Sequence, residues 1–398
     1  MTPPAVWVAL LALTGAAGPP SPPPRADAGR ERAISEIHRR AASAVPGTPE
    51  ASRLSDELGK IGRAYLDEGE NGRAIELLSE AFSLDEQNGL VLSELTLAHV
   101  RADDLESARF YLELAEERVE SAPPEIYGVL GEIYYSMNRL DDAVLAWSEF
   151  VRFGGQDPVR LKRLMHTRDE LALTRGQRSF LGEHFSIFAD PDVPDATVRL
   201  ANEDLEAAYK RESAFFGAQL SGTQVVVLYA GRSYFSLVSV PDWVSGVFDG
   251  KIRVCVETRE GAMRALSAVL VHELAHALIR QVSRDRAPGW LHEGISQWWE
   301  GRRLPRSEIK AVLGGKGPRS IEALDASFRQ KLDRGAARSS YAGALSLVEY
   351  LMAIRGEGVV ACILEGLGGG ADFADALRAE SGLTPAELFK QWRAWAGV

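Results

Sequence analysis

Val271-His-Glu-Leu-Ala-His276 lies in the run 262–281, whose pattern predicts a single helix. Residues four positions apart lie on one face of a helix about one turn apart, so His272 and His276 can both bind one metal ion. Glu273, between them, can reach a water molecule on that metal and accept its proton. A catalytic zinc ion takes three protein ligands and leaves a position for water, so a third ligand must lie elsewhere in the chain.

The third ligand is expected downstream of this helix. In metzincins it is a histidine preceded by a glycine, but Val282 and Ile279 occupy those positions here, so that class is excluded. Pro288 and Gly289 interrupt the chain and allow a second helix to begin. Glu293 stands 17 residues after the second histidine, which leaves room for the second helix to return antiparallel to the first.

The two motifs together, His272-Glu-Leu-Ala-His276 and Trp290-Leu-His-Glu293-Gly294, resemble those of the gluzincin metallopeptidases. The resemblance is greatest to the peptidase MA-like family and covers about residues 180–398. It implies a zinc peptidase that hydrolyses peptide bonds with a metal-activated water, with Zn²⁺ as the cofactor. The implied metal ligands are His272, His276 and Glu293, and the implied catalytic base is Glu273.

Three polar residues accompany Glu293 on the second helix. His292 lies about 100° away from Glu293 around the helix axis, so we expect it behind the metal ligands or on the substrate side. Gln297, four residues on, is placed to hydrogen-bond a ligand. Glu300 lies on the same face but two turns away, and we expect a structural role for it.

A tyrosine further along the chain is a second catalytic candidate. The run 339–351 begins a helix after a polar loop, and related enzymes place a tyrosine in such a segment. Its hydroxyl would donate to the oxyanion of the transition state, and Tyr341 is the residue that fits. The alternative is that the ring of Tyr341 only packs against the active-site helices.

The C-terminal part of the chain combines strands with helices. Runs of β-branched and aromatic residues predict strands at 185–189, 223–229 and 251–257, with a helix at about 195–216 between the first two. A small sheet followed by helices is an α+β arrangement. We therefore expect a gluzincin-like α+β domain here.

The strand predicted at 251–257 immediately precedes the active-site helix. The resemblance implies that it is an edge strand that pairs with extended substrate, with Arg253 and Glu257 beside the cleft. The alternative is an ordinary strand of the sheet. No acidic trio that would bind a substrate α-amino group is evident, which favours an endopeptidase.

A period of about 34 residues runs through 55–150 and resembles tetratricopeptide repeats. Small residues at repeated positions let two antiparallel helices approach closely. The positions that recur in the first and third units are Gly62, Tyr65, Ala74, Leu78 and Ala81, and Gly131, Tyr134, Ala143, Trp147 and Phe150. An all-α module of this kind predicts docking of a peptide or protein partner, and the alternative is a purely structural appendage.

Charge is distributed unevenly along the 398 residues, whose formal net charge is −11. Residues 50–150 hold 23 acidic and 8 basic side chains, a net charge of −15. Such a chain is poorly suited to binding a nucleic-acid backbone. The segment 301–338 is basic, with 10 Lys and Arg against 4 Asp and Glu. It is expected to be a rim loop that meets an acidic substrate, a partner of the acidic repeats, or a solvated surface.

The N-terminus resembles a secretory signal. The apolar stretch 5–17 is too short to span a bilayer comfortably, and the small residues Gly15 and Ala17 at its end are placed for cleavage. This predicts an exported protein, periplasmic or extracellular, without a transmembrane span in the mature chain; the alternatives are an uncleaved anchor and a mistaken start site. The predicted organisation is a signal peptide at 1–17, a Pro-rich linker at 18–30, tetratricopeptide-like repeats at 31–160, a helical linker at 161–180 and a metallopeptidase domain at 181–398.

The leading hypothesis is therefore a zinc-dependent peptidase with helical repeats for partner or substrate docking. A second hypothesis is a non-catalytic repeat scaffold with a structural zinc site, although a structural site does not need a base such as Glu273. A third is a hydrolase that uses the same metal chemistry on non-peptide bonds. The two cysteines, Cys255 and Cys362, are too few for a disulfide framework, and the sequence leaves their pairing open.

Overall fold

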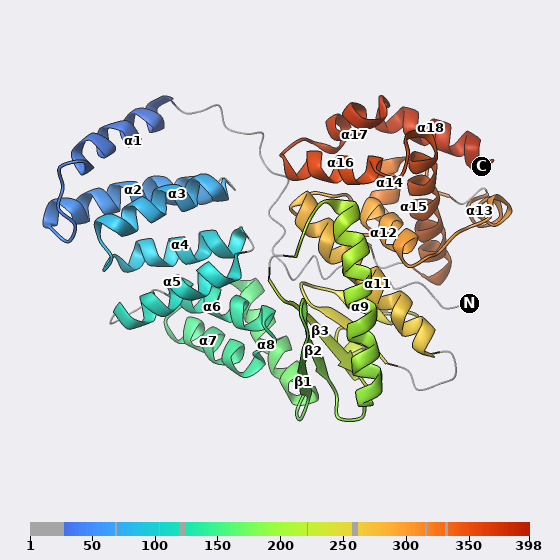
Figure 1. Cartoon of the computed structure of the whole chain (residues 1–398), viewed down its shortest axis with the longest axis horizontal. Helices are drawn as coiled ribbons and strands as arrows, with labels where there is room; N and C mark the ends of the chain where they lie inside the picture. The colour runs from blue at the N-terminus through green and yellow to red at the C-terminus, as the bar shows by residue number, and fades with distance from the viewer. Residues whose placement is uncertain are drawn as a thin grey trace. The chain divides into compact units, whose positions relative to one another are not determined.

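The computed structural model divides into two compact units, one holding the described residues up to Ala172 and the other running from Leu173 to Val398 (Figure 1). The described residues are 28–67, 70–102, 104–118, 124–220, 222–256, 262–314, 317–330 and 333–398. The signal peptide predicted at 1–17 lies outside them, as does most of the predicted linker. The domain boundaries drawn from the sequence remain predictions.

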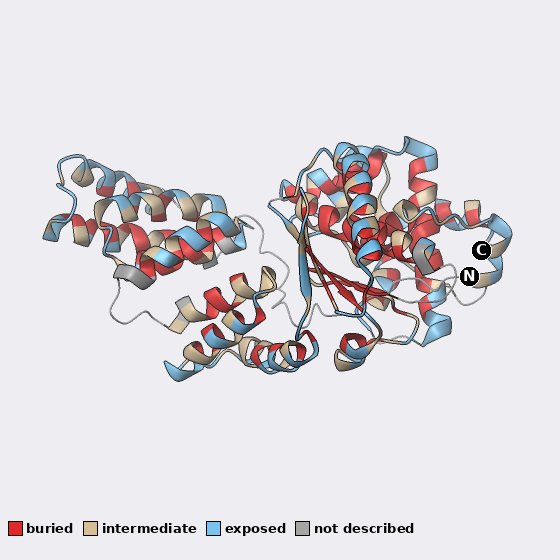
Figure 2. Cartoon of the chain, turned by 60° about the horizontal axis from the view of Figure 1, so that its bottom comes forward, coloured by how far each residue is buried: buried red, intermediate tan, exposed pale blue. Residues whose placement is uncertain are grey.

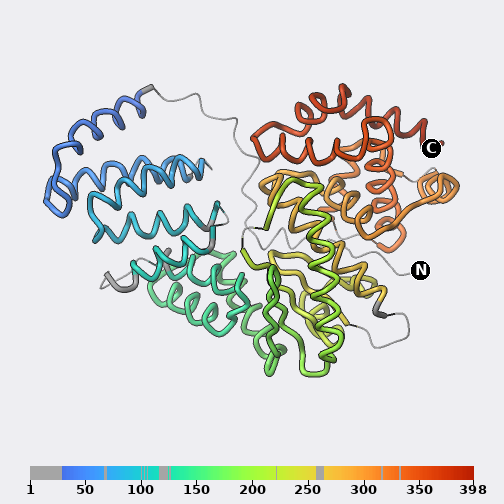
Figure 3. Tube along the Cα trace, in the orientation of Figure 1, coloured from blue at the N-terminus to red at the C-terminus, as the bar shows by residue number. Residues whose placement is uncertain are grey.

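The first unit consists of helices that pair along the chain. The bounds are α1 (Ala28–Ala41), α2 (Pro49–Asp67), α3 (Asn71–Leu84), α4 (Gly89–Arg101), α5 (Leu105–Arg118), α6 (Pro124–Ser136), α7 (Leu140–Arg152) and α8 (Pro158–Leu173). Consecutive helices pack as pairs: α2 with α3, α4 with α5, and α6 with α7. The Cα trace in Figure 3 shows these pairs. A Cβ on Gly62 would lie only 2.7 Å from Leu78, so the small residue is required where α2 crosses α3. The predicted repeat architecture is confirmed.

The second unit is built on one sheet. Its strands are β1 (Arg178–Leu181), β2 (Phe185–Ala189), β3 (Gln224–Tyr229), β4 (Gly246–Phe248) and β5 (Ile252–Cys255), in the order β1-β2-β3-β5-β4. The three central strands are parallel, with Ile187 opposite Val226 and Val226 opposite Ile252, and the outer strands β1 and β4 are antiparallel to their neighbours. Strands β3 and β5 are almost wholly buried, as apolar parallel strands at the centre of a sheet must be, and in β2 buried residues alternate with half-buried ones (Figure 2).

Helices cover this sheet and carry the rest of the unit. They are α9 (Asp195–Phe216), α10 (Ser233–Leu237), α11 (Ala262–Ser283), α12 (Gly289–Trp299), α13 (Arg306–Leu313), α14 (Ile321–Ser327), α15 (Arg334–Arg355), α16 (Val359–Gly368), α17 (Phe373–Ser381) and α18 (Pro385–Ala396). Helices α9 and α11 pack against each other, α9 also contacts β2, and α11 contacts β4 and β5. Helix α12 lies between α11 and α15. The expected α+β fold is confirmed.

One expectation about the sheet is wrong. The strand predicted at 251–257 corresponds to β5, which lies between β3 and β4 and is therefore not an edge strand. The edge strand beside α11 is β4. It has only three residues, which is too short for an alternating pattern to be recognised in the sequence.

Two further findings concern the whole chain. Cys255 is buried, Cys362 is exposed, and neither forms a disulfide. Among the described residues, no helix combines the length and the apolar character that crossing a membrane requires.

Candidate active site

The turn between α11 and α12 brings the two predicted motifs together. Arg284 and Asp285 both have positive φ, which gives the chain a tight left-handed turn after α11. Pro288 then adopts an extended conformation before the first turn of α12. The backbone N–H of Gly289 donates to the Asp325 carboxylate at 2.6 Å, which fixes the start of α12. Helix α12 consequently returns beside α11.

The predicted metal ligands His272, His276 and Glu293 converge at this helix pair. Their donor atoms all lie within 4.8 Å of one another, and all three side chains are buried. The two Nε2 atoms are 3.2 Å apart, and Glu293 oxygens lie 3.6 Å from Nε2 of His272 and 3.7 Å from Nε2 of His276. Ligands of one tetrahedral zinc ion, each bonded at about 2.0–2.1 Å, stand about 3.4 Å apart. The spacing and the nitrogen–oxygen donor set therefore both fit zinc.

Glu273 lies on the same helix, against the edge strand. A Cβ on Gly246 of β4 would come within 2.5 Å of the Glu273 carboxylate, so only glycine leaves room for it. Within the described part of the chain, Oε2 of Glu273 has no hydrogen-bond partner. Burial raises the pKa of Glu273 to about 8, against the opposing effect of His272. A cation at the three donors would lower this pKa, because it favours the charged carboxylate.

His272 is held from both ring nitrogens. Its Nδ1 lies 3.1 Å from the Glu300 carboxylate, while its Nε2 faces Glu293. Burial alone would lower the pKa of His272, but the hydrogen bonds with Glu293 and Glu300 raise it to about 10. Sequence analysis expected only a structural role for Glu300, whereas the structure shows its carboxylate in contact with the ring of His272. A carboxylate on Nδ1 directs Nε2 toward the metal position.

The Nδ1 atom of His276 faces another histidine, whereas that of His272 faces a carboxylate. Its Nδ1 lies 3.4 Å from Nδ1 of His292. Burial lowers the pKa of His292 to about 4 and that of His276 well below its usual value, so both rings are neutral near pH 7. Of the two positions left open for His292, the structure places it behind His276, one of the predicted metal ligands.

Helix α15 supports Glu293 from the opposite side. The hydroxyl of Tyr341 is buried and donates to Oε1 of Glu293 at 3.3 Å. The Gln297 side chain donates to the backbone carbonyls of Glu293, at 3.0 Å, and Tyr341, at 3.1 Å. Gln297 thus joins α12 to α15 through the backbone and does not contact a ligand side chain.

Arg253, expected beside a cleft, is fully buried instead. Its guanidinium forms an ion pair with Asp249 at 3.0 Å and donates to the hydroxyl of Tyr229 at 2.6 Å. It therefore fastens the hairpin of β4 and β5 and does not line the site. Glu257, the other residue expected there, lies outside the described residues.

Sequence analysis missed one buried acid near the site. Glu212 of α9 is fully buried, and neither carboxylate oxygen has a hydrogen-bond partner among the described residues. Burial raises its pKa well above the usual value, with His272 close enough to oppose the shift. A signal was present, because Glu212 continues the apolar stripe formed by Leu205, Ala208 and Tyr209 of α9.

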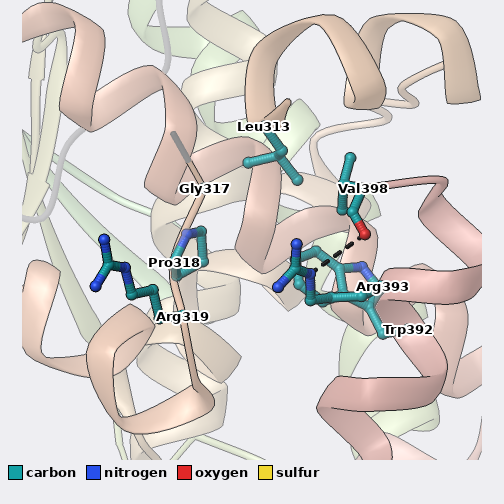
Figure 4. A pocket seen from close by; sticks show the side chains of 7 residues that line it. All are labelled: Leu313, Gly317, Pro318, Arg319, Trp392, Arg393 and Val398. Carbon is teal, nitrogen blue, oxygen red and sulfur yellow. Dashed lines mark hydrogen bonds between the residues drawn. The ribbon is translucent and has the colours of Figure 1, made fainter. Parts of the chain in front are cut away.

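Two other features of this unit lie apart from these residues. Glu183, His184 and Glu206 form a second group of possible metal ligands, but both Glu206 oxygens already accept hydrogen bonds from His184. A small pocket of about 150 Å³ is shown in Figure 4. It is lined by Leu313, Gly317, Pro318, Arg319, Trp392, Arg393 and Val398, and no candidate site residue contributes to it.

Two family models match parts of the chain. Residues 209–397 match the family model of the peptidase MA superfamily, and residues 58–88 match that of a tetratricopeptide repeat. None of the curated proteins matches the chain. Among solved structures, the tetratricopeptide domain of Sgt2 from Aspergillus fumigatus is similar, with 23% identity and a TM-score of 0.29, over 39% of this chain and 97% of that chain.

The C-terminal unit thus combines a match to the peptidase MA superfamily with a helix pair whose three converging side chains could hold a metal ion. Residues 209–397 are thus a peptidase MA superfamily domain, and the chain also carries a tetratricopeptide repeat. The superfamily indicates a peptidase-like function, and the repeat indicates a protein-docking module. Superfamily members generally depend on zinc.

Proposed function

We propose that this protein is a zinc-dependent peptidase of the gluzincin type. His272, His276 and Glu293 would hold the zinc ion, and Glu273 would be the catalytic base. The observation that carries this proposal is the convergence of three buried donors at tetrahedral spacing, with a buried carboxylate beside them. Zinc bound there would supply a Lewis acid that polarises the scissile carbonyl and activates water.

The protein side of the reaction centres on Glu273. Its carboxylate accepts a proton from the attacking water and later gives that proton to the leaving amine. Gly246 keeps the edge strand close without blocking the carboxylate. Among the described residues β4 is the last strand of the sheet, so its outer edge is where an extended peptide would pair. Binding along a strand edge suits an endopeptidase.

Two parts of the proposal concern Tyr341 and the repeats. The hydroxyl of Tyr341 lies on Glu293 and supports a role in holding that ligand; donation to the oxyanion would require the hydroxyl to turn toward the substrate. The repeats would dock a protein partner or the substrate itself. We further propose that the protein works outside the cytoplasm, on the strength of the signal-like stretch 1–17.

The substitution Glu273→Gln tests the catalytic proposal directly. It removes the base but preserves the size of the side chain, so kcat should fall by about 10²- to 10⁴-fold while zinc content stays the same. The substrate is found by mass spectrometry of cleavage sites in a proteome-derived peptide library.

The matched control is Glu349→Gln on α15, which changes a half-buried carboxylate outside the site and should leave kcat unchanged. The proposal fails if the purified protein holds no stoichiometric zinc, or if Glu273→Gln cleaves the library as well as the wild type does.

A further inference from the structure

The basic segment 301–338 has no part in the chemistry proposed above. Two of its arginines are paired with carboxylates of the same segment, Arg329 with Asp325, and Arg338 with Glu308 at 3.3 Å. The excess positive charge of the segment must therefore lie on other side chains.

Three arginines of this segment lie over tryptophan rings. The distances from guanidinium carbon to ring centroid are 4.8 Å for Arg303 and Trp298, 4.8 Å for Arg306 and Trp395, and 5.2 Å for Arg334 and Trp243. A guanidinium on a ring face keeps its N–H donors in its own plane, where a carboxylate can accept two of them. Each stacked arginine is thus oriented without being neutralised by the ring.

The Arg334–Trp243 pair is the one that joins the two sides of the site. Trp243 stands three residues before Gly246, so it lies within about 11 Å of the strand position that touches Glu273. Arg334 is the first residue of α15, about 10 Å along the helix from Tyr341, which contacts Glu293. The first distance is an upper limit between Cα atoms and the second is the rise along the helix axis, and each corresponds to about three residues of an extended peptide.

The neighbours of Arg334 leave its charge available. Its side chain is exposed, and among the described residues no carboxylate forms an ion pair with it. The adjacent Asp333 uses its carboxylate to cap α15, accepting from the backbone N–H groups of Gly335 at 2.8 Å and Ala336 at 2.9 Å. A stacked, exposed arginine about three peptide residues from the site is suited to bind an anion on the substrate.

We propose that Arg334, held over Trp243, binds an acidic side chain of the peptide within about three residues of the scissile bond. The inference rests on the proposed peptidase function and names the class of substrate: peptides with Asp or Glu close to the cleavage site. Arg334 is a specificity residue, because it contacts the substrate away from the bond that breaks.

Matched peptides test this inference. Peptides derived from a library hit carry Glu or Gln at each of the three positions on either side of the cleaved bond. At one of these positions the wild type should favour Glu in kcat/KM by about tenfold, the range expected of a charge-assisted hydrogen bond at a partly exposed site. Arg334→Gln should lose that preference and cleave the Gln peptide as the wild type does.

The matched control is Arg306→Gln, which removes another arginine stacked on a tryptophan, at helix α18. It should retain the preference for Glu. Equal rates for Glu and Gln peptides in the wild type, a preference that survives Arg334→Gln, or an equal loss in Arg306→Gln would each overturn the inference.

A binding measurement gives a second readout that does not depend on turnover. Zinc-loaded Glu273→Gln should bind the Glu peptide about tenfold more tightly than the Gln peptide, and the double variant with Arg334→Gln should bind both equally. If the wild type cleaves peptides without regard to acidic residues, this inference fails and the proposed function stands. If it cleaves no peptide, and its binding does not depend on Arg334, both fail.

Discussion

At the residue scale, the proposed metal ligands differ in which side chains hydrogen-bond to them on the side away from the metal. Glu300 lies on Nδ1 of His272, and the hydroxyl of Tyr341 lies on Glu293. Partners of this kind set the tautomer and orientation of a ligand, and their loss commonly lowers metal affinity by about 10- to 100-fold.

We therefore expect Glu300→Gln to weaken zinc binding by about 10- to 100-fold, and Tyr341→Phe to weaken it by about tenfold, the lower value for one hydrogen bond to a charged group. Competition with a chromogenic chelator measures both. Restoration of affinity by Glu300→Asp, to within a few-fold, would separate orientation of His272 from mere packing. If Tyr341→Phe lowers kcat and leaves zinc affinity unchanged, the hydroxyl acts on the oxyanion and not on Glu293.

The residues of the site differed in how readily the sequence revealed them. His272, Glu273 and His276 share one helix, so their spacing alone predicts that they meet. The place of Glu300 was harder to predict, because two helical turns separate it from Glu293. The ring of His272 contacts Glu300 through Nδ1 and Glu293 through Nε2, and the spacing of residues along one helix does not reveal such a contact. Glu212 comes from α9, and nothing local connects that helix to the motifs.

At the element scale, the approach of α12 to α15 depends on one glycine. A Cβ on Gly294 would lie 2.5 Å from the backbone carbonyl of Ala344 and 2.5 Å from Val348. The carbonyl belongs to a helix and cannot move aside alone, so a larger residue must push α12 away and carry Glu293 with it.

Gly294→Ala is therefore expected to lower the free energy of unfolding by about 1–3 kcal/mol and to weaken zinc binding as well. Urea denaturation and chelator competition measure the two effects. Gly358→Ala is the control, since a Cβ there meets no atom within 4 Å. Equal stability of the two variants would show that the helices are not in such close contact.

Elements with a long pattern were predicted well, and short ones were not. Helix α9 was expected at about 195–216 and spans Asp195–Phe216, because its apolar stripe continues over six turns. Strand β4 has three residues, Gly246–Phe248, and its position depends on pairing with β5. Non-local pairing of so short a strand leaves no periodicity to detect.

At the scale of the whole molecule, zinc should stabilise only one of the two units. All three proposed ligands lie in Leu173–Val398, so removal of zinc should lower the melting temperature of that unit and leave the repeats unchanged. A ligand at 100 times its dissociation constant stabilises by about 2.7 kcal/mol.

Calorimetry with and without chelator measures this effect. Six of the eight tryptophans lie in the second unit, so fluorescence assigns the transition that moves. A shift in the transition of the repeats, or no shift at all, would contradict the placement of the metal. A shift without hydrolysis of any peptide would instead favour the non-catalytic scaffold.

The buried ion pair of Asp249 and Arg253 affects how the edge strand β4 can unfold. Their side chains are 4% and 0% exposed, and they close the hairpin that holds β4 against β5. Separating them inside the protein would leave an uncompensated buried charge, at a cost of about 3–5 kcal/mol. Strand β4 therefore cannot fray residue by residue. We therefore expect the edge beside Glu273 to open as a unit, so that a partly folded molecule would keep no part of the proposed peptide-binding edge.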